Sequence, residues 1–378
     1  MIEKYYSGVI EQIYNRIGKE TRNIVMANYS NDFSIENLEV IRRYQSNEDN
    51  VFFAYSEFSY NTLIGAYEPF LDIICNMHRR FIGGSFDDFQ KECGVYYLHR
   101  QVLNSYYETG ECFREETVLL NEVAYERRRM TMAIADMLKR LSEVRPLMIV
   151  INRFQMASKS SIETIKYLID NPCANIGIVL GVNAIVKGTD STVEVWDRIV
   201  ESLEDRSAIY YIGSAGSLKN NVKTTNDDEL YITMNFEQSI QEASNIMEFL
   251  DFEQAKRGCR IIEHKLKFED AWIDEKSLRR FYMVYARTSV LLGEMSKAIE
   301  LTNEYKALIP KNDSEHYLSL YYFMKGTCYM YQGKLEKAGN SAKSAYDYAV
   351  LAEDDTLIFK AELLSVMIKM SGWYSIFF

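Results

Sequence analysis

One apolar run, 147–151, reads Leu-Met-Ile-Val-Ile. The residues at its end indicate what chemistry this chain could carry. The length and wholly apolar character of the run predict a buried central strand of a parallel sheet. Such a strand can present an aspartate at the edge of the sheet, where the carboxylate holds Mg²⁺ beside a bound phosphate. The residues at that point are Asn152 and Arg153. Neither supplies an anionic oxygen, so the sequence predicts that metal-assisted phosphate chemistry has been lost.

Other patterns that carry catalysis do not occur in the sequence. The six cysteines form no Cys-x-x-Cys pair and the four histidines show no ligand spacing, so we expect no metal site and reduced, cytoplasmic thiols. There is no Gly-x-Ser-x-Gly and no His-Glu-x-x-His. The net charge of −11 would repel nucleic acid, and no apolar stretch is long enough to span a bilayer. We therefore expect neither nucleic acid nor membrane as a partner.

The elements that must position these residues alternate in type along the first half of the chain. Wholly apolar runs separated by helical patterns predict an α/β domain, a parallel sheet with helices on both faces. The predicted strands are 24–27, 51–55, 147–151, 176–181 and 209–212, and the predicted helices are 35–44, 69–80, 122–142, 161–169 and 193–204. The interval between the second and third strands is mostly helical in pattern, so we expect a helical elaboration there.

Beyond a polar break at 226–229, the pattern is that of paired amphipathic helices, an all-α solenoid. Two segments are similar, 292–298 and 332–338, and each places a glycine turn before a helix that carries a small alanine. Their spacing of about 40 residues is typical of an α-solenoid repeat. An earlier copy is expected at 250–255, and a further half-repeat at 356–370.

The last residues, 373–378, are strongly apolar. Solenoids normally end in a polar capping helix. We therefore expect this chain to be the N-terminal part of a longer protein whose last repeat is left open, and self-association of such a piece is a plausible consequence.

The second half resembles tetratricopeptide repeats over roughly residues 239–371. The resemblance rests on small or aromatic residues at the positions that the family prefers, although the connections are longer than in the usual repeat. In the copy that matches best these residues are Gly326, Tyr329, Gly333, Ala338 and Ala345. In the copy before it they are Ala286, Gly293, Ala298 and Pro310. The resemblance implies a helical array that binds a protein or peptide.

The first half resembles the ATPase domain of bacterial signal-transduction ATPases of the AAA-like, multi-domain (STAND) kind, over about residues 14–215. The shared features are an aromatic-proline segment at 67–70 and a Glu/Arg-rich helix at 122–129. In the family, the third strand is followed by two aspartates, a Trp-Ala-Asp-like turn and serines. Segment 151–158 keeps a Gln-x-Ala sequence, and Ser160 and Ser161 follow, but the acids are missing. The resemblance implies a P-loop fold that couples a nucleotide switch to a repeat array.

In this family the phosphate loop follows the first strand, which places it at 27–34. A working loop needs glycines, whose N–H groups wrap the phosphates, and a lysine that reaches the terminal oxygens. By position, Phe33 replaces the lysine, Asp32 adds repulsive charge, and no glycine is present. Ser34 stands where a Mg²⁺-binding hydroxyl is expected, and a helix N-cap explains it as well. The degenerate nucleotide-binding positions are Ser30, Asp32, Phe33, Ser34, Asn152, Arg153 and Asn183, the last where a γ-phosphate sensor or a simple turn would stand.

These observations predict a degenerate P-loop ATPase-like domain at 1–215, a linker at 216–238 and tetratricopeptide-like repeats at 239–378. The leading interpretation is a non-catalytic regulatory or scaffolding module of a bacterial signalling protein, which binds its partner through the repeats and needs no cofactor. Related architectures imply an output domain after the repeats, such as a diguanylate cyclase or a DNA-binding domain.

Two alternatives remain open. The first is an active switch that binds ATP or ADP with Mg²⁺ and controls such an output domain; the carboxylates available to it are Asp32, Glu57 and Glu122. The second is a small-molecule sensor, because the cleft at the carboxyl ends of the strands is the usual ligand site of an open α/β sheet. The residues expected to line that cleft, or simply to fill a core, are Tyr29, Phe33 and Phe154.

Overall fold

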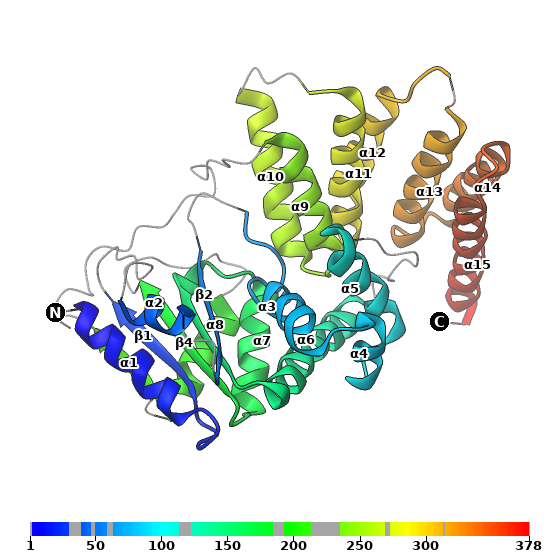
Figure 1. Ribbon diagram of the computed structural model, residues 1–378. Coiled ribbons are helices and arrows are strands. Elements are labelled where there is room, and N and C mark those ends of the chain that lie inside the picture. The colour runs from blue at the N-terminus through cyan, green and yellow to red at the C-terminus, as the bar shows by residue number, and fades with distance from the viewer. Residues whose placement is uncertain are drawn as a thin grey trace. The chain divides into compact units, whose positions relative to one another are not determined.

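The computed structural model describes residues 2–29, 39–46, 50–58, 63–112, 122–183, 193–206, 208–212, 235–268, 273–312 and 314–377. The chain divides into two compact units. The first comprises 1–114, 124–234 and 248–254, and the second comprises 115–123, 235–247 and 255–378. The described elements of the first unit are a sheet and its helices, and those of the second are helices (Figure 1).

The sheet of the first unit has five strands, all parallel, in the order β2-β3-β4-β1-β5. The prediction of five strands in a parallel sheet is confirmed, and most strands extend one or two residues beyond the predicted ends. Because the strands are parallel, their carboxyl ends meet at one edge of the sheet. The strands are β1 Ile24–Tyr29, β2 Phe52–Glu57, β3 Leu147–Asn152, β4 Ile176–Asn183 and β5 Ile209–Ile212.

Helices surround this sheet on both faces (Figure 1). The helical elaboration expected between the second and third strands is present, as α3 to α6. The helix α1 before the first strand was not predicted. The helices are α1 Ile2–Arg16, α2 Glu39–Ser46, α3 Phe70–Met77, α4 Phe86–Glu92, α5 Tyr97–Thr109, α6 Val123–Val144, α7 Lys159–Asp170 and α8 Val193–Glu204, with a π-helical turn η1 at His78–Ile82 and a 3-10 turn η2 at Phe154–Met156.

The helix α1 lies close over β4. Tyr6 and Ile13 of α1 are fully buried in a core that includes side chains of β1, β3 and β4. Beneath them β4 presents Gly177 and Gly181. A Cβ atom at Gly177 would lie within 2.9 Å of both Ile13 and Ile17, and a Cβ atom at Gly181 would clash with the hydroxyl group of Tyr6. The two glycines therefore allow the helix to approach the strand this closely.

The central strand β3 is buried along its whole length. Its side chains alternate between the α1 face and the opposite face, which α7 and α8 cover (Figure 1). Met148 and Val150 belong to the core under α1, so Ile149 and Ile151, also fully buried, point to the other side. Burial on both faces explains why this run is apolar without alternation.

The second unit is built from consecutive helices joined mostly by short turns. In each of the helix pairs α11–α12 and α13–α14, the predicted glycine turn joins the two helices. The helices are α9 Phe236–Glu248, α10 Phe252–Phe268, α11 Glu275–Leu291, α12 Met295–Ala307, α13 Glu315–Tyr331, α14 Leu335–Leu351 and α15 Asp355–Phe377. Within the described residues, every helix of the protein is too short or too polar to cross a bilayer.

Three turns of this unit share one backbone geometry. Each contains a residue with positive φ: Gly293 at 78°, Gly333 at 72° and Glu353 at 53°. The amide of the next residue donates to a carbonyl in the last turn of the preceding helix, over 2.8 to 3.1 Å. This is the hydrogen-bond pattern of a Schellman motif, in which glycine is the favoured residue. The repeated turn supports the internal similarity that the sequence indicated.

The residues that the repeat pattern singled out lie between packed helices. Ala298, Ala338 and Ala345 are fully buried. Gly326 is buried too, and a Cβ atom there would lie 3.0 Å from Leu364 and 3.3 Å from the Cβ atom of Ser341. Tyr329 is half-buried. Small residues at these positions let neighbouring helices approach closely.

The approach of α1 to β4 gives a first prediction. Gly181→Ala is expected to destabilise the protein by about 1–3 kcal/mol, because the added methyl group overlaps a buried tyrosine that cannot move without disturbing the core. Tyr6→Phe in the same chain should recover part of this loss, since it removes the oxygen atom nearest to the methyl group. The free energy of unfolding from urea titration measures both effects.

Gly8→Ala is the matched control, because Gly8 lies on α1 itself, is exposed, and has no atom within 4 Å of the place that an added Cβ atom would take. It should stabilise the protein by roughly 0.5–1 kcal/mol through helix propensity. Equal effects of the two alanine substitutions would contradict the close packing of α1 on β4.

Candidate functional site

The carboxyl edge of the sheet carries a polar residue at the end of each of four strands. The strand pairing sets Glu57 of β2 beside Asn152 of β3, and Tyr29 of β1 beside Asn183 of β4. This edge is where an open α/β sheet usually binds its ligand. Asn152, Asn183 and Tyr29 are each at most 4 % exposed, so the strand ends are covered by the protein itself.

Asn152 stands at the end of β3, where a metal-binding acid was expected from the sequence. Its Oδ1 atom accepts a hydrogen bond of 2.5 Å from the hydroxyl group of Tyr29. The two residues are on strands separated by β4, so the bond passes over β4 at Gly181, where any side chain would be in the way. Tyr6 lies edge-on to Tyr29, with ring centroids 6.4 Å apart. Burial, then the neighbouring Tyr29 and Glu57, raise the pKa of Tyr6, so its hydroxyl group keeps its proton.

The neighbouring carboxylate, Glu57, is already bound on both oxygen atoms. Arg153 forms an ion pair with Oε1 over 3.2 Å, and the Tyr55 hydroxyl group donates to Oε2 over 2.5 Å. Both members of the ion pair are less than one-fifth exposed. Arg153 has a left-handed backbone, φ 55°, which turns the chain sharply after β3. Both carboxylate oxygen atoms of Glu57 are therefore engaged, one in the ion pair with Arg153 and the other in the hydrogen bond from Tyr55.

The turn η2 closes the space next to Asn152. Phe154 is fully buried, and its ring centroid lies 6.4 Å from that of Phe58 and 5.8 Å from that of Trp196. Gln155 accepts a hydrogen bond of 3.1 Å from the backbone N–H of Asn183. Asn183 is the residue where a γ-phosphate sensor was considered. Its backbone N–H thus binds a side chain of the protein.

The serines that follow η2 hold the backbone. Ser158 accepts from the N–H of Ser161 and caps α7. The Ser160 hydroxyl oxygen accepts from the N–H of Tyr67 over 3.0 Å, and the Ser161 hydroxyl group donates to the carbonyl oxygen of Glu68 over 2.7 Å. These bonds tie the aromatic-proline segment to the start of α7. In this arrangement the serines support the fold of the edge, and their hydroxyl groups are not directed at a ligand.

A buried carboxylate completes this cluster. Asp251, 1 % exposed, accepts from the backbone N–H of Ser160 over 3.0 Å and from that of Gln254 over 3.4 Å. Burial raises the pKa of Asp251, and the hydrogen bonds from Ser160 oppose this shift. Arg127 lies between Glu163 at 3.5 Å and Glu253 at 3.3 Å, so positive charge compensates the nearby acids.

The structure brings together only some of the residues expected at a nucleotide site. Asn152, Arg153 and Asn183 lie at one edge of the sheet, whereas Ser30, Asp32, Phe33 and Ser34 fall outside the described residues. Sequence reasoning did not identify Tyr6, Tyr55, Gln155 or Gly181. The apolar spacing of Tyr6, Val9, Ile10 and Ile13 was a detectable signal for α1, but the hydrogen bonds of single polar residues carry no sequence pattern.

In the part of the chain that the structure describes, no three His, Cys, Asp or Glu side chains gather as a metal site would require. No family model, no curated protein and no solved structure matches this chain.

Asp251 gives a pH-dependent prediction. Because its pKa is raised above the ordinary 3.8, the folded state holds the proton to higher pH than the unfolded state does. Its stabilising contribution is thus complete below about pH 3.8 and is lost as the pH rises through the folded value. Asp251→Asn should cost about 1–3 kcal/mol by removing one acceptor from the buried N–H groups, and this deficit should shrink as the pH rises above the ordinary pKa of the carboxyl group.

Asp88→Asn is the control with the opposite sign. Asp88 is exposed, and its hydrogen bond with Lys91 lowers its pKa, so any deficit should appear at neutral pH and vanish on acidification. The free energy of unfolding, measured by urea titration at several pH values, compares the variants. A deficit of Asp251→Asn that grows toward neutral pH would contradict the buried, proton-retaining carboxylate.

Proposed function

We propose that this protein is a non-catalytic scaffolding module: a P-loop-like domain that no longer works on nucleotides, joined to a tetratricopeptide-like array that binds a protein partner. One observation carries the proposal. The position where a metal-binding acid would stand is held by Asn152, whose side-chain oxygen is fully buried and bonded to Tyr29. An amide in that bond offers no anionic oxygen to Mg²⁺, which takes carboxylates and phosphate oxygens as ligands.

The surrounding groups support the same conclusion. Among the described residues, the acid paired with Asn152 in the strand register is Glu57, whose two oxygen atoms already bind Arg153 and Tyr55. Releasing it would break the ion pair with Arg153, both members of which are poorly exposed, and this is costly. The edge is therefore better suited to rigid structure than to a cycle of nucleotide binding and release.

The strand order supports a relationship to the P-loop ATPases. In the order β2-β3-β4-β1-β5, β4 lies between β1 and β3, as in the AAA-like ATPases that the sequence resembles. This differs from the strand orders of the dinucleotide-binding and flavodoxin-like folds. The fold is thus compatible with descent from an ATPase whose phosphate- and metal-binding residues were replaced.

The interaction surface is proposed on α15. One stripe of this helix, Leu357, Ala361, Leu364 and Ile368, is buried against its neighbours. A second stripe is apolar but exposed by 40 to 59 %, and consists of Phe359, Leu363, Val366 and Met370. A helix that is apolar on both sides is normally covered on both, and contiguous exposed apolar surface marks protein interaction sites. A protein partner covering this second stripe fits both expectations.

The nucleotide part of the proposal is tested by calorimetry with the full chain. We expect no saturable heat with Mg-ATP or Mg-ADP at low-millimolar concentration, because Asn152 and Glu57 are both engaged. Asn152→Asp, which returns a carboxylate to this position, should bind no better, since the Tyr29 hydroxyl group remains a hydrogen-bond partner of the side chain there. Micromolar binding by the wild-type chain at this edge would contradict the proposal.

The interaction part is tested with Phe359→Glu/Val366→Glu. A partner isolated from the source cells on the wild-type chain is purified and titrated against both proteins, and the double variant should bind at least roughly 30-fold more weakly, as expected for loss of an interface hot spot. Asn303→Glu/Asn340→Glu, at exposed positions on α12 and α14 away from the stripe, adds the same charge, is the matched control and should bind normally. Equal binding by both double variants would place the interface elsewhere.

A further inference from the structure

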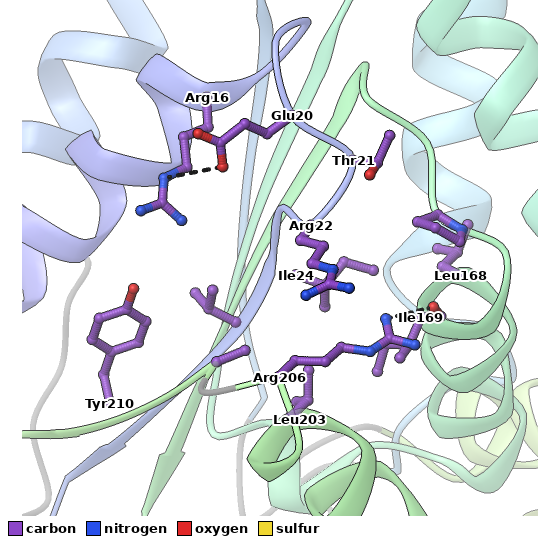
Figure 2. Close-up of a pocket in the computed structure, with 13 residues that line it drawn as sticks. Arg16, Glu20, Thr21, Arg22, Ile24, Leu168, Ile169, Leu203, Arg206 and Tyr210 are labelled. Atoms are coloured by element: carbon purple, nitrogen blue, oxygen red, sulfur yellow. Dashed lines mark hydrogen bonds and ion pairs between the residues drawn. The ribbon is translucent and has the colours of Figure 1, made fainter.

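The opposite edge of the sheet has a cavity that differs in character from the carboxyl edge. It lies at the amino ends of β1 and β5, among the last turns of α1, α7 and α8, and has a volume of about 170 Å³. Its floor is apolar and comes from Ile24, Val25, Leu168, Ile169 and Leu203. Figure 2 shows the cavity between these elements, with arginine side chains reaching into it.

Three arginines and one carboxylate line this cavity, Arg16, Arg22, Arg206 and Glu20. The only acid is paired with Arg16 at 3.6 Å, a long contact between partly exposed groups. The cavity therefore has an excess of two positive charges in a protein whose net charge is −11. A local excess of this kind focuses anions into a low-dielectric recess.

One of these arginines, Arg206, has a structural role at a helix C-terminus. Cations are favoured at helix C-termini, because the last carbonyl groups carry partial negative charge. Arg206 fills this role, since it donates to the carbonyl oxygen of Ile169 in the last turn of α7 over 2.8 Å. That bond uses one of its N–H groups and fixes the guanidinium, which leaves the others for a ligand.

Arg22 is not explained by such a role. It lies in the segment between α1 and β1, is exposed, and in the described part of the chain makes no ion pair or hydrogen bond. In Figure 2 its guanidinium group reaches toward the same space as that of Arg206. Two guanidinium groups above an apolar floor could bind a ligand that has an anionic group at one end and an apolar part at the other.

The rim of the cavity is held in place without a ligand. The carbonyl oxygen of Ala174 accepts from the N–H of Gly18 over 2.8 Å and from the side chain of Asn23 over 3.1 Å. These bonds tie the segment that carries Arg22 to the loop after α7. A preformed rim lowers the entropic cost of binding.

We infer that this cavity is a binding site for a small aryl anion, a carboxylate or phosphate monoester whose ring lies on the apolar floor and whose oxygens bind Arg22 and Arg206. The size agrees with this class, since an apolar cavity of roughly 150 Å³ admits a benzene ring. Thr21 and Tyr210 also line the cavity, and the Tyr210 hydroxyl group donates to Gln12. The site shares no residue with the carboxyl edge, so the inference is independent of the proposed function.

The inference is tested by titrating the full chain with phenyl phosphate and benzoate in a calorimeter. At least one aryl anion should bind saturably with a low-millimolar or tighter Kd, and inorganic phosphate and benzyl alcohol, which lack the ring or the charge, should bind at least roughly tenfold more weakly. Arg22→Gln, a substitution at an exposed residue that leaves the fold intact, should weaken the aryl anion by roughly tenfold, the effect of losing one charged hydrogen bond.

Arg140→Gln is the matched control, because Arg140 is half-exposed on α6, pairs with Glu143 and does not line the cavity. It removes the same charge and should leave the affinity unchanged. Absence of saturable binding of both aryl anions, or equal weakening by the two substitutions, would overturn the inference. Equal affinity for inorganic phosphate and phenyl phosphate would overturn the apolar part of the assignment.

The same variant separates this site from the proposed function. Heat with Mg-ATP that disappears in Arg22→Gln would come from the anion cavity and would support it. Heat that is unchanged in Arg22→Gln would come from another place and would contradict the proposal that the carboxyl edge is closed.

Discussion

The close contact between α1 and β4 is the constraint on which the first unit depends. A helix can lie this near a strand only where the strand carries glycine at the points of closest approach, and Gly177 and Gly181 meet this condition. Glycine is unfavourable in a strand because it loses more conformational entropy on folding and packs no side chain. The burial of Tyr6 and Ile13 of α1 against the sheet offsets that cost. The packing of α1 therefore depends on the glycines of β4, and the burial of α1 side chains in turn stabilises the sheet.

The chemistry of the carboxyl edge follows from the same contact. With no side chain at Gly181, the Tyr29 hydroxyl group reaches across β4 to Asn152. Once this bond is formed, an ionised acid at 152 would have to be buried beside two tyrosine rings and the carboxylate of Glu57, an expensive environment for a negative charge. Buried polar groups stabilise only when their hydrogen bonds are made, so the network favours a fixed arrangement. The close packing at Gly181 and the presence of asparagine at position 152 are therefore physically linked.

The sequence allowed the strands to be predicted but not their order or their polar contacts. Wholly apolar runs such as 147–151 and 176–181 are recognisable because strands buried on both faces do not alternate. The order of strands depends on crossovers whose direction leaves no local signal. The region of Asn152 and Arg153 was correctly located as polar residues at the end of β3, because the expected acid was missing at a definable point. The partners Tyr29, Tyr55 and Gln155 could not be inferred, since each contact joins residues distant in sequence or depends on side-chain direction.

The two edges of the sheet differ in how their charges are balanced. At the carboxyl edge, Arg153 and Glu57 neutralise each other and the neutral polar side chains bond among themselves, so a charged ligand would have to displace bonds that already exist. At the amino edge, the arginines exceed the acids, and the helix C-termini hold Arg206 without consuming all of its donors. A ligand there would add bonds without breaking any. The described residues thus place balanced charges at the carboxyl edge and an excess of positive charge at the amino edge, which is where we expect an anionic ligand to bind.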